Sequence, residues 1–105
     1  MAYDVILAPT AVQQFKALKA QVRAAVRDAM EQHLCHTPTR VSKSRIKRLR
    51  GLAQTQFRLR VDEIRVFYDV GEQVVEVLAI VTKAQAQEWL KEEGVPDEES
   101  GAGEG

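Results

Sequence analysis

The chain has 105 residues, of which 45% are hydrophobic and 29% are charged. This length leaves room for one domain but not for a second independent core. A single cysteine, Cys35, excludes an internal disulfide and fits a reducing compartment. The N-terminal stretch MAYDVILAP is too short for a secretory signal and contains Asp4. No apolar run approaches the roughly 20 residues that span a bilayer. We therefore expect a cytoplasmic protein with no membrane partner.

The formal net charge of zero hides an uneven distribution. Between residues 40 and 68, nine Lys and Arg residues stand against two carboxylates, which leaves +7. From residue 69 onward, ten carboxylates stand against two lysines, which leaves −8. Charge segregated in this way produces a local field that the total conceals. The alternative is that each run is simply a solvated face.

The first third of the chain is predicted to be mostly helical. Residues 3–8 form a short predicted strand, after which Thr10 is expected to cap a helix. Apolar residues then recur at spacings of three and four as far as about Leu34, the pattern of an amphipathic helix. This pattern fits either one long helix or a helical hairpin broken near residues 19–21.

In the middle of the chain, the apolar residues begin to recur at every second position. Residues 40–56 are basic and weakly patterned, with Gly51 as an expected turn. Three strands are predicted over 57–61, 64–70 and 74–81, and the last of these is apolar on both faces, as a covered strand would be. A final helix over 84–93 is expected to stop at Gly94 and Pro96.

These elements predict an α+β fold. We expect a small antiparallel sheet in the order β-α-(α)-β-β-β-α, with the helices packed on one side, within one domain spanning residues 1–94. Residues 95–105 are acidic, rich in glycine and without apolar anchors. They are expected to form a disordered tail.

The two strands at 57–61 and 64–70 predict an arginine-faced hairpin. A two-residue turn at 62–63 places every apolar residue of the core-facing side opposite an apolar residue of the other strand. It also sets Arg60 directly opposite Arg65, with Arg58 on the same face, although like charges facing each other are destabilising. Guanidinium groups bind phosphate through two parallel hydrogen bonds, so the cluster favours a polyanion, most of all RNA. The alternative is that the arginines are solvated or paired with nearby carboxylates.

Further side chains are candidates for binding or for chemistry. Phe67 could stack on a base or lie beneath the last helix, which Trp89 is expected to anchor to the sheet. His33, Cys35 and His36 lack the spacing of a zinc site, and no phosphate-binding loop appears, so we expect neither a metal nor an organic cofactor. Phosphate contacts of the RNA backbone are expected from Lys43, Arg45, Lys47, Arg48 and Arg50.

Four segments in order, KRLRGL at 47–52, FRLRV at 57–61, IRVFYDV at 64–70 and VLAIV at 77–81, resemble the RelE/ParE superfamily of bacterial toxins, most of all its RelE-like branch. The resemblance covers nearly the whole chain. It implies a RelE-like fold and a toxin that is paired with a cognate antitoxin encoded beside it.

RelE-type toxins cut mRNA in the ribosomal A site, so the resemblance implies the ribosome and mRNA as partners. It implies that Arg58 and Arg60 form a basic pair, that Arg65 holds the phosphate and that Lys83 adds positive charge. The sequence departs from the pattern further on, because Ala84 stands near an expected arginine and no tyrosine lies near Trp89.

Two other functions remain open. ParE-type relatives share the fold and inhibit DNA gyrase by protein contact, and a catalytically weak member would only bind its antitoxin. The RelE-like function is favoured because three guanidiniums on one sheet face suit RNA.

Overall fold

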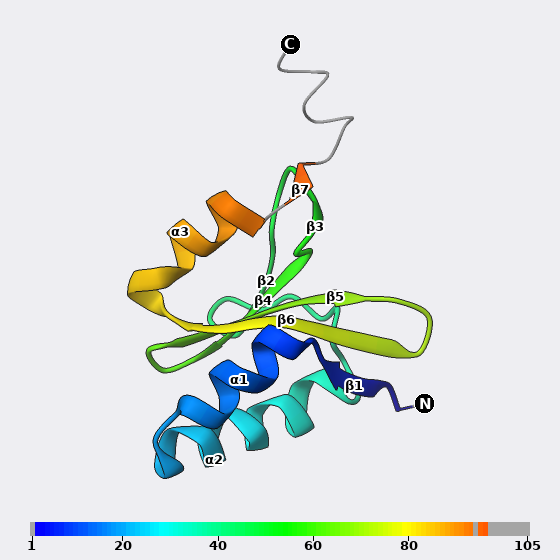
Figure 1. Cartoon of the computed structure of the whole chain (residues 1–105). Helices are drawn as coiled ribbons and strands as arrows, with labels where there is room; N and C mark the ends of the chain where they lie inside the picture. The colour runs from blue at the N-terminus through cyan, green and yellow to red at the C-terminus, as the bar shows by residue number, and fades with distance from the viewer. Residues whose placement is uncertain (1, 94, 97–105) are drawn as a thin grey trace.

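The computed structural model describes residues 2–93 and 95–96. Its centre is a five-stranded sheet in the order β1-β6-β5-β4-β2, and a second, two-stranded sheet joins β3 to β7 (Figure 1). The strands are β1 (Asp4–Leu7), β2 (Ile46–Arg48), β3 (Leu52–Gln54), β4 (Phe57–Val61), β5 (Ile64–Val70), β6 (Val74–Thr82) and β7 (Val95–Pro96). The helices are α1 (Pro9–Ala17), α2 (Ala20–Ala29), its π-helical continuation η1 (Met30–Leu34) and α3 (Lys83–Glu93). No helix in this described part is long and apolar enough to cross a membrane.

The α+β class is confirmed, but the sheet is mixed rather than antiparallel. β1 runs parallel to β6, with Asp4 opposite Val74 and Leu7 opposite Val77. The other strand pairs of the large sheet are antiparallel. Only antiparallel strands can be joined by a tight hairpin turn. Because β1 and β6 lie far apart in the sequence, no short connection forces an antiparallel direction on β1.

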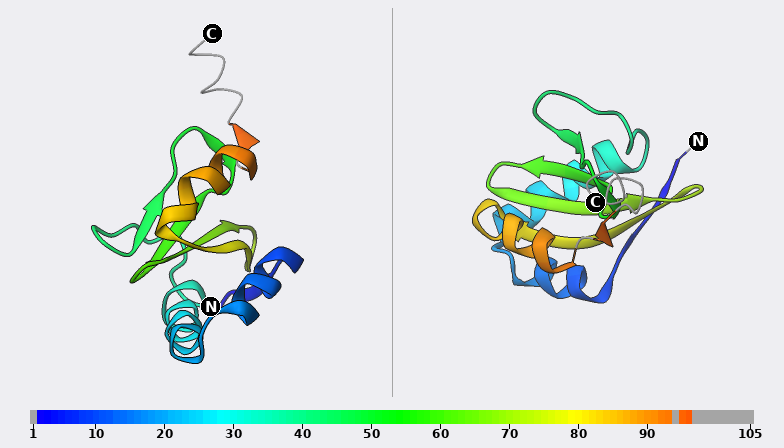
Figure 2. Two further views of the ribbon diagram at one scale, coloured as in Figure 1. Left: turned by 60° about the vertical axis from the view of Figure 1, so that its left-hand side comes forward. Right: turned by 90° about the horizontal axis from the view of Figure 1, so that it is seen from above.

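The helices cover both faces of the sheet, so the prediction that they pack on one side is wrong. α1 and α2 lie against one face and α3 against the other (Figures 1 and 2). The reason is found in β5, whose alternating side chains are buried on both faces. Val66 and Tyr68 point into the larger core beside α1 and α2, while Phe67 points to the opposite face and needs α3 to cover it.

The helical region is a hairpin, broken at Leu18 and Lys19, which are both extended. α1 starts at Pro9 with Ala8 as its N-cap, so the prediction that Thr10 caps this helix is wrong. Proline suits the first helical position because its fixed φ is helical and its missing N–H would have no helical partner there.

Two short segments differ from the sequence-based expectation. The weakly patterned region 40–56 contains β2 and β3, and Gly51 occupies the turn between them with a φ of 75°. Val95 and Pro96, which the sequence places in the tail, form β7 and pair with β3. The expected stop at Gly94 and the expected disorder of 97–105 lie outside the described residues.

The larger core is tied to the loop after the helices by one buried hydrogen bond. Tyr68 is fully buried and stacks on Phe57 with ring centroids 5.5 Å apart. Its hydroxyl donates to the Pro38 carbonyl oxygen at 2.6 Å. Burial raises the pKa of Tyr68, because the phenolate would lose its hydration.

The β4–β5 hairpin has the register that the sequence predicts, with Arg60 opposite Arg65 and Arg58 opposite Phe67. Arg65 is nevertheless only 6% exposed. Its Nη1 donates to the carbonyl oxygens of Asp62 at 2.7 Å and Ile64 at 3.1 Å. Since Asp62 has a φ of 52°, which few non-glycine residues adopt, Arg65 holds a turn that is itself unusual.

Replacing Tyr68 by Phe should lower the free energy of unfolding by about 1–2 kcal/mol, because the Pro38 carbonyl is left without its buried donor. Tyr3→Phe, at the margin of the same core, is the matched control and should change stability by less than about 0.5 kcal/mol. Urea unfolding measures both. Equal effects of the two variants would contradict the role of the hydroxyl.

The raised pKa of Tyr68 also predicts a pH dependence. Above about pH 10 an unfolded tyrosine loses its proton, while folded Tyr68 keeps it. The unfolded state then binds fewer protons than the folded state, so stability falls as the pH rises. Tyr68→Phe lacks this loss, and its deficit relative to the natural protein should shrink between about pH 9 and pH 11. A stability deficit that stays constant over this pH range would contradict the raised pKa of Tyr68.

Truncation of the two facing arginines should lower the stability of the protein by different amounts. Arg65→Ala should cost about 1–3 kcal/mol of stability, because two backbone carbonyls at the turn lose a charged donor. Arg60→Ala should stay within about 0.5 kcal/mol, because Arg60 is exposed and its removal relieves repulsion. Thermal or urea unfolding compares them. If the two losses were the same, Arg65 would not hold the turn.

Candidate functional site

Four basic side chains converge on a cleft between the sheet and α3, which we call the cationic cleft. Its volume is about 420 Å³. Lys47 comes from β2, Arg58 from β4, Arg65 from β5 and Lys83 from the start of α3. Among the described residues that line it there is no carboxylate. The rest of the lining is mostly apolar, namely Leu49, Phe67, Ala84, Ala86, Gln87 and Leu90.

Strand pairing and one backbone hydrogen bond set the shape of the cationic cleft. Lys47 stands opposite Arg58 in the antiparallel pair β2–β4, so the two side chains share a face. Lys83 follows β6 directly, and its backbone N–H donates to the Glu63 carbonyl oxygen at 2.7 Å. This bond fixes the start of α3 beside the hairpin turn and thereby closes one side of the cleft.

Arg58 is the side chain in the cleft whose surroundings most favour an anion. Its Nε is buried and has no hydrogen-bond partner. Burial lowers the pKa of Arg58, and the guanidiniums of Arg65 and Arg60 lower it further. A guanidinium stays charged even so. An oxyanion bound here would supply both the missing acceptor and the missing negative charge.

The three predicted arginines do not all line the cleft. Arg58 and Arg65 do, whereas Arg60 is exposed and lies outside the lining, although its charge still acts on Arg58. Arg65 directs Nη1 to the turn, so it serves the hairpin as well as the cleft. Lys83, the fourth predicted catalytic residue, lies in the cleft.

The five residues that are predicted to contact the RNA backbone do not lie together in the structure. Only Lys47 lines the cationic cleft, while Lys43, Arg45 and Arg50 are exposed elsewhere. Arg48 alternates to the other face and lies over the Phe57 ring, 5.1 Å from its centroid. Arg45 acts near the helices instead, where burial lowers the pKa of His33 and Arg45 lowers it further.

The aromatic pair across α3 and β5 is structural. Phe67 is 1% exposed and stacks on Trp89, with ring centroids 5.0 Å apart and an interplanar angle of 7°. Phe67 is therefore not available to stack on a base, and Trp89 anchors α3 as expected. Gln87 and Leu90, which no sequence pattern marks as functional, share the cleft-facing side of α3 with Lys83 through spacings of four and seven residues.

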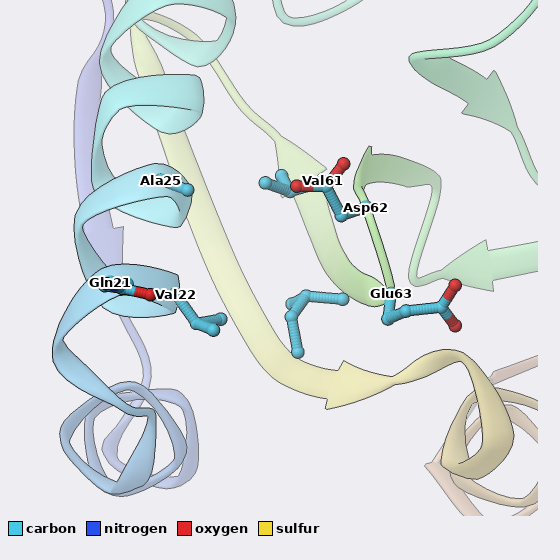
Figure 3. Close-up of a pocket in the computed structure, with 7 residues that line it drawn as sticks. Gln21, Val22, Ala25, Val61, Asp62 and Glu63 are labelled. Atoms are coloured by element: carbon cyan, nitrogen blue, oxygen red, sulfur yellow. The ribbon is translucent and has the colours of Figure 1, made fainter.

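A second hollow, of about 370 Å³, lies between α2 and the tip of the β4–β5 hairpin (Figure 3). Val22 of α2 and Val61 of β4 point into it, and the Glu63 carboxylate points away from α2. No Lys, Arg or His is found among the described residues that line it. This hollow is thus unsuited to a polyanion, and the cationic cleft is the candidate functional site.

Comparison with known proteins identifies the family. Residues 5–87 match the family described as the ParE toxin of the type II toxin-antitoxin system, parDE. No curated protein matches the sequence. Among solved structures, the RelBE2 toxin–antitoxin complex from Mycobacterium tuberculosis has 25% identity and a TM-score of 0.62, covering 78% of this chain and 99% of that chain.

Two further structures confirm the RelE-like fold. Free Escherichia coli RelE, with two arginines replaced by alanine, has 25% identity and a TM-score of 0.63, covering 84% of this chain and 90% of that chain. The RelB–RelE complex from Methanococcus jannaschii has 17% identity and a TM-score of 0.63, covering 80% of this chain and 96% of that chain. Because the family match covers most of the chain and the fold agrees with it, this protein belongs to the ParE toxin family of type II toxin–antitoxin systems, within the RelE/ParE superfamily.

Proposed function

We propose that this toxin is a ribosome-dependent endoribonuclease that binds the scissile phosphate of mRNA in the cationic cleft. The observation that carries the proposal is the buried Nε of Arg58, which has no partner and is surrounded by the positive charge of Lys47, Arg65 and Lys83. A phosphodiester is the anion that fits this pattern of donors. The cleft is lined on one side by α3, which suits a single strand better than a duplex.

The proposed reaction is cleavage by the neighbouring ribose. The 2′-hydroxyl oxygen attacks the adjacent phosphorus, the bond from phosphorus to the 5′ oxygen breaks, and the products are a 2′,3′-cyclic phosphate and a 5′-hydroxyl. Negative charge builds up on the phosphate oxygens in the transition state, where fixed donors stabilise it most. Arg58 and the free donors of Arg65 take this role.

Two protons must also move, one from the 2′-hydroxyl and one to the departing 5′ oxygen. Arginine remains protonated and cannot exchange them. Among the described residues of the cleft lining, Lys47 and Lys83 carry the groups that can exchange a proton with the substrate. Because this lining holds no His, Tyr or carboxylate, we expect cleavage to be slow.

The protein partner follows from the same relatives. The structures from M. tuberculosis and M. jannaschii are complexes of a toxin with its antitoxin. We therefore propose that a cognate antitoxin binds this chain and inhibits it. An acidic antitoxin segment would suit the +7 charge of residues 40–68.

A second candidate function is inhibition of DNA gyrase by protein contact. Two observations favour it: the matching family is that of ParE toxins, and the cleft lining lacks the usual proton-transfer groups. In that case, the basic surfaces would bind a protein or DNA without cutting RNA.

Primer extension on an mRNA undergoing translation in a purified system tests the proposed cleavage. The natural protein should produce cuts within codons, and Arg58→Gln should reduce the cleavage rate about 100-fold through loss of phosphate stabilisation. Lys47→Ala and Lys83→Ala should lower the rate while ribosome and mRNA binding persist. Lys16→Ala, an exposed lysine of α1 outside the cleft, is the control and should leave the rate unchanged.

A supercoiling assay with purified gyrase separates the alternatives. Inhibition of gyrase without mRNA cuts would overturn the ribonuclease and support the second function. If neither activity is present and induction leaves growth unaffected, the chain is a family member that only binds its antitoxin.

A further inference from the structure

One edge of the large sheet is left open over half of β6. β6 spans nine residues, but β1 pairs only with residues 74–77 of it. After Leu7 the chain enters α1, so residues 78–82 have no strand neighbour on that side in the part of the chain that the structure describes. We call this stretch the open edge of β6.

Side chains take the place of a strand along the open edge. The Gln14 Oε1 accepts a hydrogen bond from the Ile80 N–H at 2.7 Å, and the Gln85 Oε1 accepts one from the Thr82 N–H at 3.2 Å. Gln14 belongs to α1 and Gln85 to α3, so both flanking helices contribute. Side-chain amides that satisfy backbone donors in this way can be exchanged for the carbonyl groups of an incoming strand.

A groove lies beside the open edge, and its lining comes from both α1 and α3. It consists of two hollows, of about 180 Å³ and 330 Å³, that are both lined by Trp89. Thr10 and Gln14, one helical turn apart, line it from α1. Leu78 and Val81 of β6 supply apolar surface, so the groove offers an apolar floor and a strand edge together.

The groove has the opposite charge to the cationic cleft. Glu88, Glu92 and Glu93 of α3 line it, and no Lys, Arg or His is found among its described lining residues. Glu88 and Glu92 are four residues apart and lie on the same side of the helix. Nucleic acid is repelled by such a surface, whereas a basic polypeptide is attracted.

We propose that this groove binds an extended, basic segment of a partner protein, which adds as a strand to the open edge of β6. Its backbone would replace the amides of Gln14 and Gln85, its Lys or Arg side chains would contact Glu88 and Glu92, and an apolar side chain would pack on Trp89. The groove adjoins the cationic cleft, with which it shares Ala84, but the binding proposed for it does not depend on RNA cleavage.

The test uses a synthetic peptide with alternating basic and apolar residues, acetyl-Arg-Val-Arg-Leu-Arg-Val-Arg-amide. Trp89 is the only tryptophan of the chain, so its fluorescence reports occupation of the groove. NMR signals of the Ile80 and Thr82 amides report replacement of the side-chain amides. We expect saturable binding that shifts all three signals, with no binding of a peptide that carries Glu in place of Arg.

Two comparisons of variants make the test specific. Glu88→Lys with Glu92→Lys should weaken binding of the peptide at least tenfold. Glu72→Lys with Glu76→Lys makes an equal charge change at exposed positions outside the groove and should weaken binding less than twofold. Gln14→Ala should strengthen binding several-fold, because it removes the competitor for the Ile80 N–H. Arg58→Gln should leave the binding of the peptide unchanged, because Arg58 lines the cationic cleft and not the groove.

Several outcomes would overturn the proposal. They are the absence of saturable binding, equal loss in the two charge-reversed variants, and undiminished binding of an N-methylated peptide that cannot pair with a strand. Circular dichroism of each variant shows whether it is folded. If a reversed variant unfolds, Glu88→Gln with Glu92→Gln takes its place with a smaller expected loss.

Discussion

The burial of β5 on both faces is the constraint on which the rest of this structure depends. Val66 and Tyr68 on one face require the cover that α1 and α2 supply, and Phe67 on the other requires α3. Because α3 must stand over the face that also carries the arginines, that face becomes one wall of a cleft instead of an open surface. The stack of Phe67 and Trp89 therefore sets the geometry in which the Nε of Arg58 is buried.

The parts of the fold that the sequence predicts are those with enough residues to show a period. The register of the β4–β5 hairpin follows from alternation, because a shift of one residue would expose every apolar side chain. β2, β3 and β7 have two or three residues each and show no period. The parallel direction of β1 and the position of α3 depend on contacts between distant segments, which local patterns do not contain.

The candidate site, like the fold, is predicted by local patterns only in part. Alternation placed Arg58, Arg60 and Arg65 on one face, but it could not predict that Arg60 lies outside the cleft or that Arg65 folds back on its own turn. Both depend on how far α3 covers the face. The basic residues of the described lining come from β2, β4, β5 and α3, which are brought together by sheet pairing and helix packing rather than by any local pattern.

The pairing of β7 with β3 has a consequence for how far the cationic cleft can open. α3 is attached at both ends, by the bond from the Lys83 N–H to the Glu63 carbonyl oxygen at its start and by the β3–β7 pair that follows it. A helix held at both ends cannot swing away from the sheet unless one of these attachments breaks. The cleft therefore keeps its width, and an anion that enters it meets donors that are already in place.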